Sequence, residues 1–264
     1  MTAYHGYTCA SYQNVLKKNA PLKNIYSEKD RCFIVGNGPS LAKQDLSPLA
    51  NEHVFVVNWF YKHKQFREIL PEYYTFTSPY AFTDFKYGVY SEFAKWWREL
   101  SDALNETRGR TKLFLPLNQI DFCVRNHLFE NADVHFLLTS LPMDKYGIRK
   151  VNLCGCIPSG ASTVGINMLI AYYMGFRNMI LIGCDCSWAA LRSEDAHFYP
   201  EKIHPPSKYE QVLRDAMDQF AGYRILRNFL VPRGCKVHDA TEGGFLDVFP
   251  KVKYEELFPS SMKR

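Results

Sequence analysis

The sequence has no apolar run near the roughly 20 residues that a membrane-spanning helix needs. Its first 18 residues lack the basic-then-apolar pattern of a secretory signal peptide. Neither sign of charge dominates, because 32 Lys and Arg stand against 27 Asp and Glu, for a net charge of +5. We therefore expect a cytoplasmic protein that does not bind nucleic acid. An anionic substrate, peripheral contact with a membrane surface and a homo-oligomer are all compatible with this composition.

The eight cysteines lack the spacing of a structural zinc site. Cys154 and Cys156 form one C-x-C pair, and Cys184 and Cys186 form another, whereas structural zinc sites place about two to four residues between paired ligands. The favoured interpretation is reduced thiols that act as small apolar side chains. A four-thiol metal site is the alternative, and no other metal ligands are predicted.

The two common nucleotide fingerprints, GxGxxG and GxxxxGK[ST], are also absent. What the chain has is RCFIVGNGPSL at positions 31–41. The apolar run predicts a buried parallel strand, and Gly36 and Gly38 allow a tight turn that a ligand can approach closely. Pro39 and Ser40 suit the first turn of a helix, whose N-terminus favours phosphate. The stretch predicts a strand–loop–helix unit for a nucleotide phosphate, and an ordinary turn is the alternative.

Apolar runs alternate with helical patterns along the rest of the chain. Further strands are expected at 54–58, 73–77, 112–116, 133–138, 151–154, 178–185 and 235–239, and helices at 88–104, 163–175 and 207–230. The alternation predicts an α/β fold with a Rossmann-like, mostly parallel sheet and helices on both faces. Residues 1–30 are interpreted as an N-terminal appendage, residues 31–258 as the main domain, and residues 189–206 as a small lid insertion.

Polar residues stand where three of the expected strands end. They are Asn58, Ser78 and Asp185. Ligands of open α/β sheets lie outside the carboxyl ends of the strands, so these residues should lie near the glycine turn. Asp185 could accept a hydrogen bond from a ribose or sugar hydroxyl, or it could cap the turn that follows it.

A second loop of small residues precedes the expected helix at 163–175. Ser159 and Gly160 lead into Ser162 and Thr163, and the helix that follows is almost wholly apolar, which predicts that it is buried. The positive end of a buried helix at such a loop predicts a second anion site. A close-packed loop without a ligand is the alternative.

Four segments together resemble a known family. GNGPSL at 36–41, VFVVNWFY at 54–61, SG at 159–160 and LIGCD at 181–185 are similar, in this order, to the bacterial sialyltransferases of glycosyltransferase family 42. They also resemble a related group named after 6-hydroxymethylpterin pyrophosphokinase. The likeness covers roughly residues 31–250. It implies a GT-A-variant-like nucleotide-sugar-binding domain, a CMP-activated sialic acid or related nonulosonic acid as donor, a glycan acceptor, inversion at the transferred sugar and no obligatory cofactor or metal.

The resemblance also implies roles for individual positions. Asn37 and Gly38 would lie along the phosphate and ribose of CMP, and Asn58 would contact the nucleotide. The expected nucleotide-binding set is Gly36, Asn37, Gly38, Ser40, Asn58, Ser78, Ser159, Gly160, Gly183 and Asp185. Where the family has Asn-Pro after the third strand, this chain has Ser78 and Pro79, and the region after Asp185 is shorter than in the family.

Catalysis is expected from the segment that follows Asp185. Histidine titrates near neutral pH and is the natural base for an acceptor hydroxyl. His197 is the predicted base, His204 is the reserve, and Tyr199 is expected near the departing phosphate. Two other functions are weighed: a pterin or nucleotide pyrophosphokinase, which would need Mg²⁺ held by Asp185 with Glu194 or Asp195, and a nucleotide-binding module without turnover.

Overall fold

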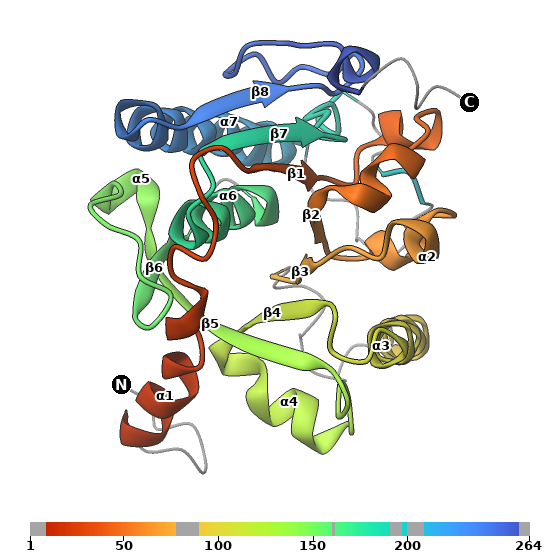
Figure 1. Ribbon diagram of the computed structural model, residues 1–264, viewed down its shortest axis with the longest axis vertical. Helices are drawn as coiled ribbons and strands as arrows, with labels where there is room; N and C mark the ends of the chain where they lie inside the picture. Colours follow the sequence, from red (N-terminus) through yellow and green to blue (C-terminus); the bar gives the residue numbers. More distant parts are fainter. Residues whose placement is uncertain (1–8, 78–89, 160–161, 191–196, 200–208, 259–264) are drawn as a thin grey trace.

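The computed structural model describes residues 9–77, 90–159, 162–190, 197–199 and 209–258. They form an α/β fold around one eight-stranded sheet (Figure 1). The strands are β1 (Arg31–Val35), β2 (His53–Val57), β3 (Tyr73–Thr75), β4 (Lys112–Pro116), β5 (Asp133–Pro142), β6 (Cys156–Ser159), β7 (Asn178–Ile182) and β8 (Lys236–Asp239). Their order is β6-β5-β4-β3-β2-β1-β7-β8, and all neighbours are parallel. The predicted sheet is confirmed.

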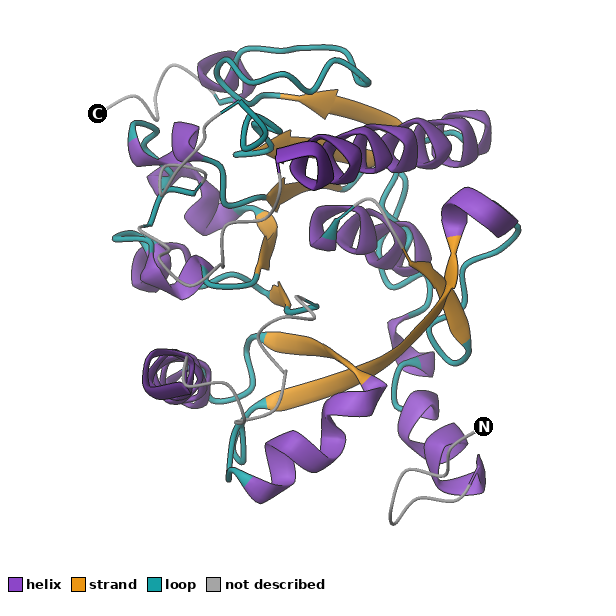
Figure 2. Ribbon diagram, turned by 180° about the vertical axis from the view of Figure 1, so that it is seen from behind, coloured by secondary structure: helices purple, strands orange, loops and turns teal. Residues whose placement is uncertain are grey.

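Helices cover both faces of the sheet, as predicted (Figure 2). The α-helices are α1 (Cys9–Lys17), α2 (Phe66–Ile69), α3 (Tyr90–Glu106), α4 (Ile120–Arg125), α5 (Met143–Tyr146), α6 (Thr163–Met174) and α7 (Tyr209–Leu230). Side chains of β1 alternate between two apolar cores, as the two-residue period of a strand requires. Ile34 packs in the core that includes α6 and α7, and Phe33 packs in the core that includes α3.

Helix α6 is almost wholly buried and positions one side of the site. Ten of its twelve residues are buried, which confirms the prediction from its apolar sequence. Gly175 ends it in the left-handed conformation at φ 109°, and a side chain there would overlap the carbonyl of Tyr26. The helix packs on β1 and β2, so its N-terminus lies at the carboxyl ends of these strands.

Two sequence-based boundaries at the sheet edge are wrong. Residues 151–154 form no strand, and the last parallel strand on this side is β6, four residues long. Strand β5 continues to Pro142, beyond the end expected at residue 138. β6 tolerates Pro158 because it is an edge strand, where a missing N–H breaks no ladder.

The N-terminal stretch is tied to the sheet by a buried asparagine. Asn19 is fully buried, and its Nδ2 donates to the carbonyls of Phe136 and Leu153, at 2.8 Å each. Its Oδ1 lies 2.9 Å from Nδ1 of His135. Among the residues placed by the structure, no helix is both long and apolar enough to cross a membrane.

His135 is held in its neutral form by burial. Its ring is 3% exposed, and its Nε2 lies 3.3 Å from a carboxylate oxygen of Asp133, which also pairs with Lys18 and Lys112. Burial lowers the pKa of His135 to about 4, because the charged imidazolium would lose its hydration. The unfolded chain therefore takes up this proton more readily than the folded one.

We expect the free energy of unfolding to fall as the pH falls from about 6.5 to about 4, by about 3 kcal/mol from this residue. His135→Gln keeps a hydrogen-bond donor for Asn19 but has no titrating ring. Its free energy of unfolding should therefore fall less over this pH window, as measured by urea titrations at several pH values. Burial also lowers the pKa of His63, and this residue contributes equally to the pH dependence of the wild type and of His135→Gln. His127→Gln, at an exposed histidine, is the control and should leave the slope unchanged. An equal slope for wild type and His135→Gln would contradict the assignment.

Candidate active site

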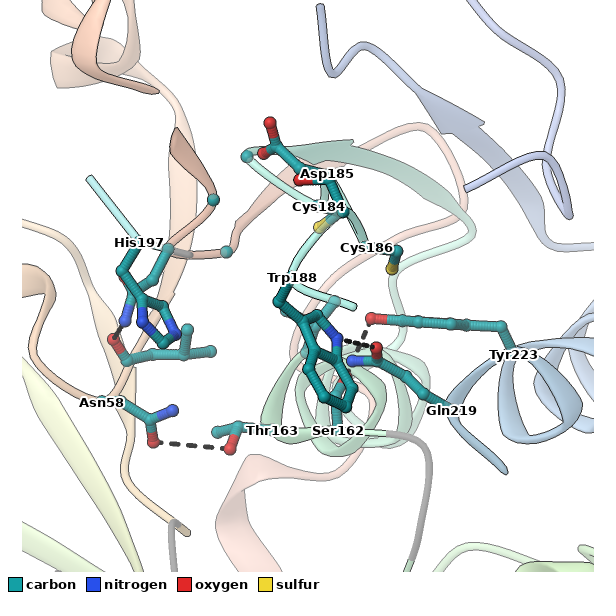
Figure 3. A pocket seen from close by; sticks show the side chains of 17 residues that line it. Asn58, Ser162, Thr163, Cys184, Asp185, Cys186, Trp188, His197, Gln219 and Tyr223 are labelled. Carbon is teal, nitrogen blue, oxygen red and sulfur yellow. Dashed lines mark hydrogen bonds between the residues drawn. The ribbon is translucent and has the colours of Figure 1, made fainter. Parts of the chain in front are cut away.

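A pocket opens at the carboxyl ends of β1, β2 and β7 (Figure 3). It encloses about 550 Å³ of space, part of which is open solvent. The lining residues are Gly36, Asn37, Gly38, Val57, Asn58, Ser162, Thr163, Val164, Gly183, Cys184, Asp185, Cys186, Ser187, Trp188, His197, Gln219 and Tyr223.

The structure brings most of the predicted site residues to this pocket. Those that line it are Gly36, Asn37, Gly38, Asn58, Gly183, Asp185 and His197. Ser40, Ser159 and Tyr199 are described but are not part of the lining. Ser78, Gly160 and His204 lie outside the described residues, as does most of the predicted lid. The binding role of each residue stays a prediction.

The turn after β1 does not begin an α-helix, and that prediction is wrong. Pro39–Ala42 form a single 3₁₀ turn, η2. The backbone N–H of Ser40 donates to Oδ1 of Asp185 at 3.1 Å, and its hydroxyl donates to Oδ2 at 2.8 Å. The chain's own carboxylate therefore occupies the position where the sequence suggested a phosphate.

The two glycines of this turn are explained by the same contact. A Cβ on Gly38 would overlap Oδ2 of Asp185, and a Cβ on Gly36 would overlap the carbonyl of Gly183. The N–H of Gly36 donates to the carbonyl of Ile182, and that of Gly38 donates to the carbonyl of Gly183, both at 2.8 Å. Close approach of the β1 and β7 turns to each other thus requires the glycines.

Asp185 is 6% exposed and is held from several sides. Burial raises its pKa, while the hydrogen bonds from Ser40 lower it, and the net shift is upward. Its backbone carbonyl accepts from the N–H of Phe245 at 2.7 Å. The carboxylate therefore bonds to the turn after β1, whereas one of the two interpretations from the sequence had it cap the turn that follows Asp185. A bond to a ribose or sugar hydroxyl stays a prediction.

The N-terminus of α6 forms part of the pocket wall. Ser162 is its N-cap, with an oxygen that accepts from the N–H of Gly165 at 3.2 Å and lies 2.8 Å from the hydroxyl of Tyr223. The Thr163 hydroxyl donates to Oδ1 of Asn58 at 3.4 Å (Figure 3). A helix of twelve residues thus directs its positive end to a pocket in which the lining residues that the structure describes include no Lys or Arg.

Asn37 leaves a buried acceptor without a partner. Its side chain is 93% buried, and Nδ2 donates to the carbonyl of Val57 at 3.1 Å. Within the described part of the chain, its Oδ1 has no hydrogen-bond donor. Buried polar atoms are nearly always paired, so this oxygen is a candidate acceptor for a hydrogen bond from a ligand.

His197 lines the pocket, and Tyr199 lies behind it. Their rings stack with centroids 5.0 Å apart and planes within 6°. Tyr199 is buried, and its hydroxyl lies 3.5 Å from Nδ2 of Asn37. The N–H of Phe198 donates to the backbone carbonyl of Asn37 at 3.0 Å, which ties the segment to the β1 turn. Tyr199 therefore supports the His197 ring. Its expected place near the departing phosphate stays a prediction.

Ten of the seventeen lining residues are absent from the predicted site. The largest side chains among them are Trp188, Gln219 and Tyr223. Nε1 of Trp188 donates to Oε1 of Gln219 at 3.0 Å, which joins the loop after β7 to α7. The one available signal was the position of Trp188, three residues after Asp185 at the end of an expected strand.

The cysteines of the pocket are protonated thiols. Burial raises the pKa of Cys186 to about 12 and holds that of Cys184 well above its usual value. In the part of the chain that the structure places, no three His, Cys, Asp or Glu side chains are grouped so as to hold a metal ion.

The chain matches no protein-family model and no curated protein sequence. Among solved structures, the MAf glycosyltransferase from Magnetospirillum magneticum AMB-1 aligns over 94% of this chain with a TM-score of 0.53 and 16% identity. This chain spans 39% of the length of that protein. At this identity the likeness establishes a shared α/β fold.

Two sialyltransferase structures align less well. Sialyltransferase CST-II in complex with a trisaccharide acceptor and CMP aligns over 84% of this chain and 85% of that one, with 15% identity and a TM-score of 0.47. CstII from Campylobacter jejuni, with the substrate analogue cytidine-5'-monophosphate, aligns over 84% of both chains, with 15% identity and a TM-score of 0.42.

We expect Gly38→Ala to destabilise the fold by about 1 to 3 kcal/mol, because its Cβ would displace the Asp185 carboxylate. Gly155→Ala is the matched control, since the nearest heavy atom to a Cβ there lies 3.8 Å away. Chemical denaturation of both variants measures the difference. If Gly38→Ala is as stable as Gly155→Ala and only ligand binding is lost, Gly38 makes room for the ligand, and the claim that it makes room for the Asp185 carboxylate is wrong.

Proposed function

We propose that this chain is a glycosyltransferase that moves a sugar from a CMP-activated donor to a glycan acceptor with inversion. A sialic acid or related nonulosonic acid is the proposed sugar. The fold is shared with a glycosyltransferase, and the motifs that resemble family 42 supply eight of the pocket-lining residues. The observation that carries the proposal is that the N-terminus of α6 and the unpaired Oδ1 of Asn37 both belong to one pocket.

The charges of the pocket favour a donor with one phosphate. The macrodipole places about half a positive charge at the N-terminus of α6. A nucleoside diphosphate brings more negative charge and is commonly neutralised by Lys, Arg or Mg²⁺. The described lining supplies one buried carboxylate, Asp185, and no cationic side chain. A single phosphodiester matches this environment better than a diphosphate does.

The orphaned oxygen of Asn37 favours a ligand with hydroxyl or amino donors. A ribose hydroxyl or the exocyclic amine of a base could donate to it, and a bare phosphate could not. The carried-over role of Asn37 along the nucleotide agrees with this requirement. The acceptor is proposed to be a glycan because the chemistry needs a free hydroxyl as nucleophile.

The proposed mechanism uses the pocket wall that carries His197. Its imidazole takes the proton of the acceptor hydroxyl as that oxygen attacks the anomeric carbon of the donor. The bond from this carbon to the phosphate oxygen breaks, and the charge grows on the departing CMP. Backbone N–H groups in the first turn of α6 are fixed dipoles that stabilise this charge. Stacking on Tyr199 holds the imidazole ring in one orientation.

Nucleotide-dependent thermal shifts combined with CMP-release assays test the proposal. CMP should stabilise the protein without Mg²⁺, and CMP-activated nonulosonic acids should release CMP faster when glycan acceptors are present. Stabilisation by ATP with Mg²⁺ alone would favour the pyrophosphokinase alternative and overturn the transferase. Binding of CMP without release of CMP from any donor would favour a binding module.

His197→Ala should lower turnover by about two orders of magnitude or more, the usual effect of removing a general base, while CMP still binds. His127→Ala, at an exposed histidine far from the lining, is the matched control. Measurement of kcat together with the CMP-induced thermal shift separates catalysis from binding. Transfer by His197→Ala at the wild-type rate would remove His197 as the base.

A further inference from the structure

One side of the pocket is built from an indole and an amide that belong to none of the resembling motifs. Trp188 follows the β7 turn, Gln219 lies on α7, and both line the pocket. The Nε1–H of Trp188 donates to Oε1 of Gln219 at 3.0 Å, so each side chain orients the other. Figure 3 shows them on the side of the pocket opposite His197 and Asn58.

The hydrogen bond determines what the amide can offer a ligand. Oε1 of Gln219 accepts from the indole, which directs the two N–H donors of Nε2 away from Trp188. The side chain extends from α7 into the pocket (Figure 3). A cytosine ring carries two adjacent acceptors, O2 and N3, that match such a donor. A uracil ring has an N–H at position 3, which would face the amide N–H unfavourably.

The indole offers a flat apolar surface next to these donors. Trp188 is half-buried, whereas Trp59, Trp96 and Trp97 are 3%, 7% and 2% exposed and belong to the core. Stacking of a base on an aromatic ring contributes about 1 to 3 kcal/mol. A partly exposed indole held in one orientation is suited to stacking because little rotational freedom is lost on binding.

We propose that Trp188 and Gln219 form the nucleobase subsite, where the indole stacks on a pyrimidine and the Gln219 amide donates to its acceptor edge. The inference rests on the proposed function, because it takes the donor to be a nucleotide sugar. It assigns the base to the wall formed by α7 and the phosphate to the N-terminus of α6. In this assignment Asp185, whose carboxylate is bonded to Ser40, is not needed to bind the base, although the resemblance placed it in the nucleotide-binding set.

Intrinsic fluorescence provides a direct readout, because the chain has four tryptophans and three of them are in the core. CMP should quench the wild-type emission, and Trp188→Phe should lose this quenching while CMP still binds in a calorimeter. Trp188→Ala, which removes the stacking surface, should weaken CMP binding about tenfold or more. Unfolding curves of both variants show whether the fold is kept.

Gln219→Glu separates recognition from structure. The carboxylate still accepts from Nε1 of Trp188 and has nearly the same volume, but it has no N–H to donate to a base. We expect CMP affinity to fall about tenfold and the preference for CMP over UMP to disappear. Gln211→Glu makes the same change of charge at an exposed position of the same helix and should bind CMP as the wild type does.

The outcomes distinguish the two proposals. If Trp188→Ala and Gln219→Glu bind CMP as tightly as the wild type and keep its preference over UMP, the nucleobase subsite is overturned and the proposed function stands. If the wild type binds no nucleotide at all, the proposed function fails and the subsite fails with it.

Discussion

The close contact between the turn after β1 and the turn after β7 positions the rest of the site. Two backbone hydrogen bonds join the turns, and the Asp185 carboxylate bridges them by accepting from Ser40. Asn37 then projects from the joined turns, and its backbone carbonyl holds the segment that carries His197. Without Gly36 and Gly38 the turns could not approach, and these pocket walls would lose their fixed spacing.

This contact also decides where a ligand's charge can be stabilised. A carboxylate buried in the β1 turn repels a phosphate there, because two like charges in a poorly solvated site are costly. The remaining source of positive potential in the described lining is the N-terminus of α6, opposite that turn. Oδ1 of Asn37, in the same lining, is the acceptor that the proposal assigns to a hydroxyl or amine of the ligand. In the proposed complex the phosphate therefore lies at α6 and a hydrogen-bond donor of the ligand lies at Asn37.

The sequence was sufficient for the central strands and for α6. Continuous apolar runs that end in glycine or a polar residue predicted β1, β2 and β7, because a strand buried on both faces needs apolar side chains at every position. Helix α6 followed from an apolar segment with Ser162 before it and Gly175 after it. Strand β6 was missed because Ser159 and the small residues after it predicted a loop, and its place at the sheet edge depends on the order of the strands.

The candidate site was predictable only in part. Strand-end positions predicted that Asn58 and Asp185 would lie at one pocket. The partner of a carboxylate depends on tertiary contacts, so the bond between Asp185 and Ser40 could not be predicted. The resemblance implied a role for Tyr199 near the departing phosphate, and only the tertiary structure shows that its ring stacks on His197. Trp188 and Gln219 come together only because α7 crosses beside the loop after β7, which no local pattern encodes.

A crystal structure of the protein with CMP would test the central claim most directly. The account predicts that the phosphate lies within hydrogen-bonding distance of the first-turn N–H groups of α6, with the Asp185 carboxylate still bonded to Ser40. A phosphate bound by Gly38 and Ser40, with the Asp185 side chain displaced, would contradict it.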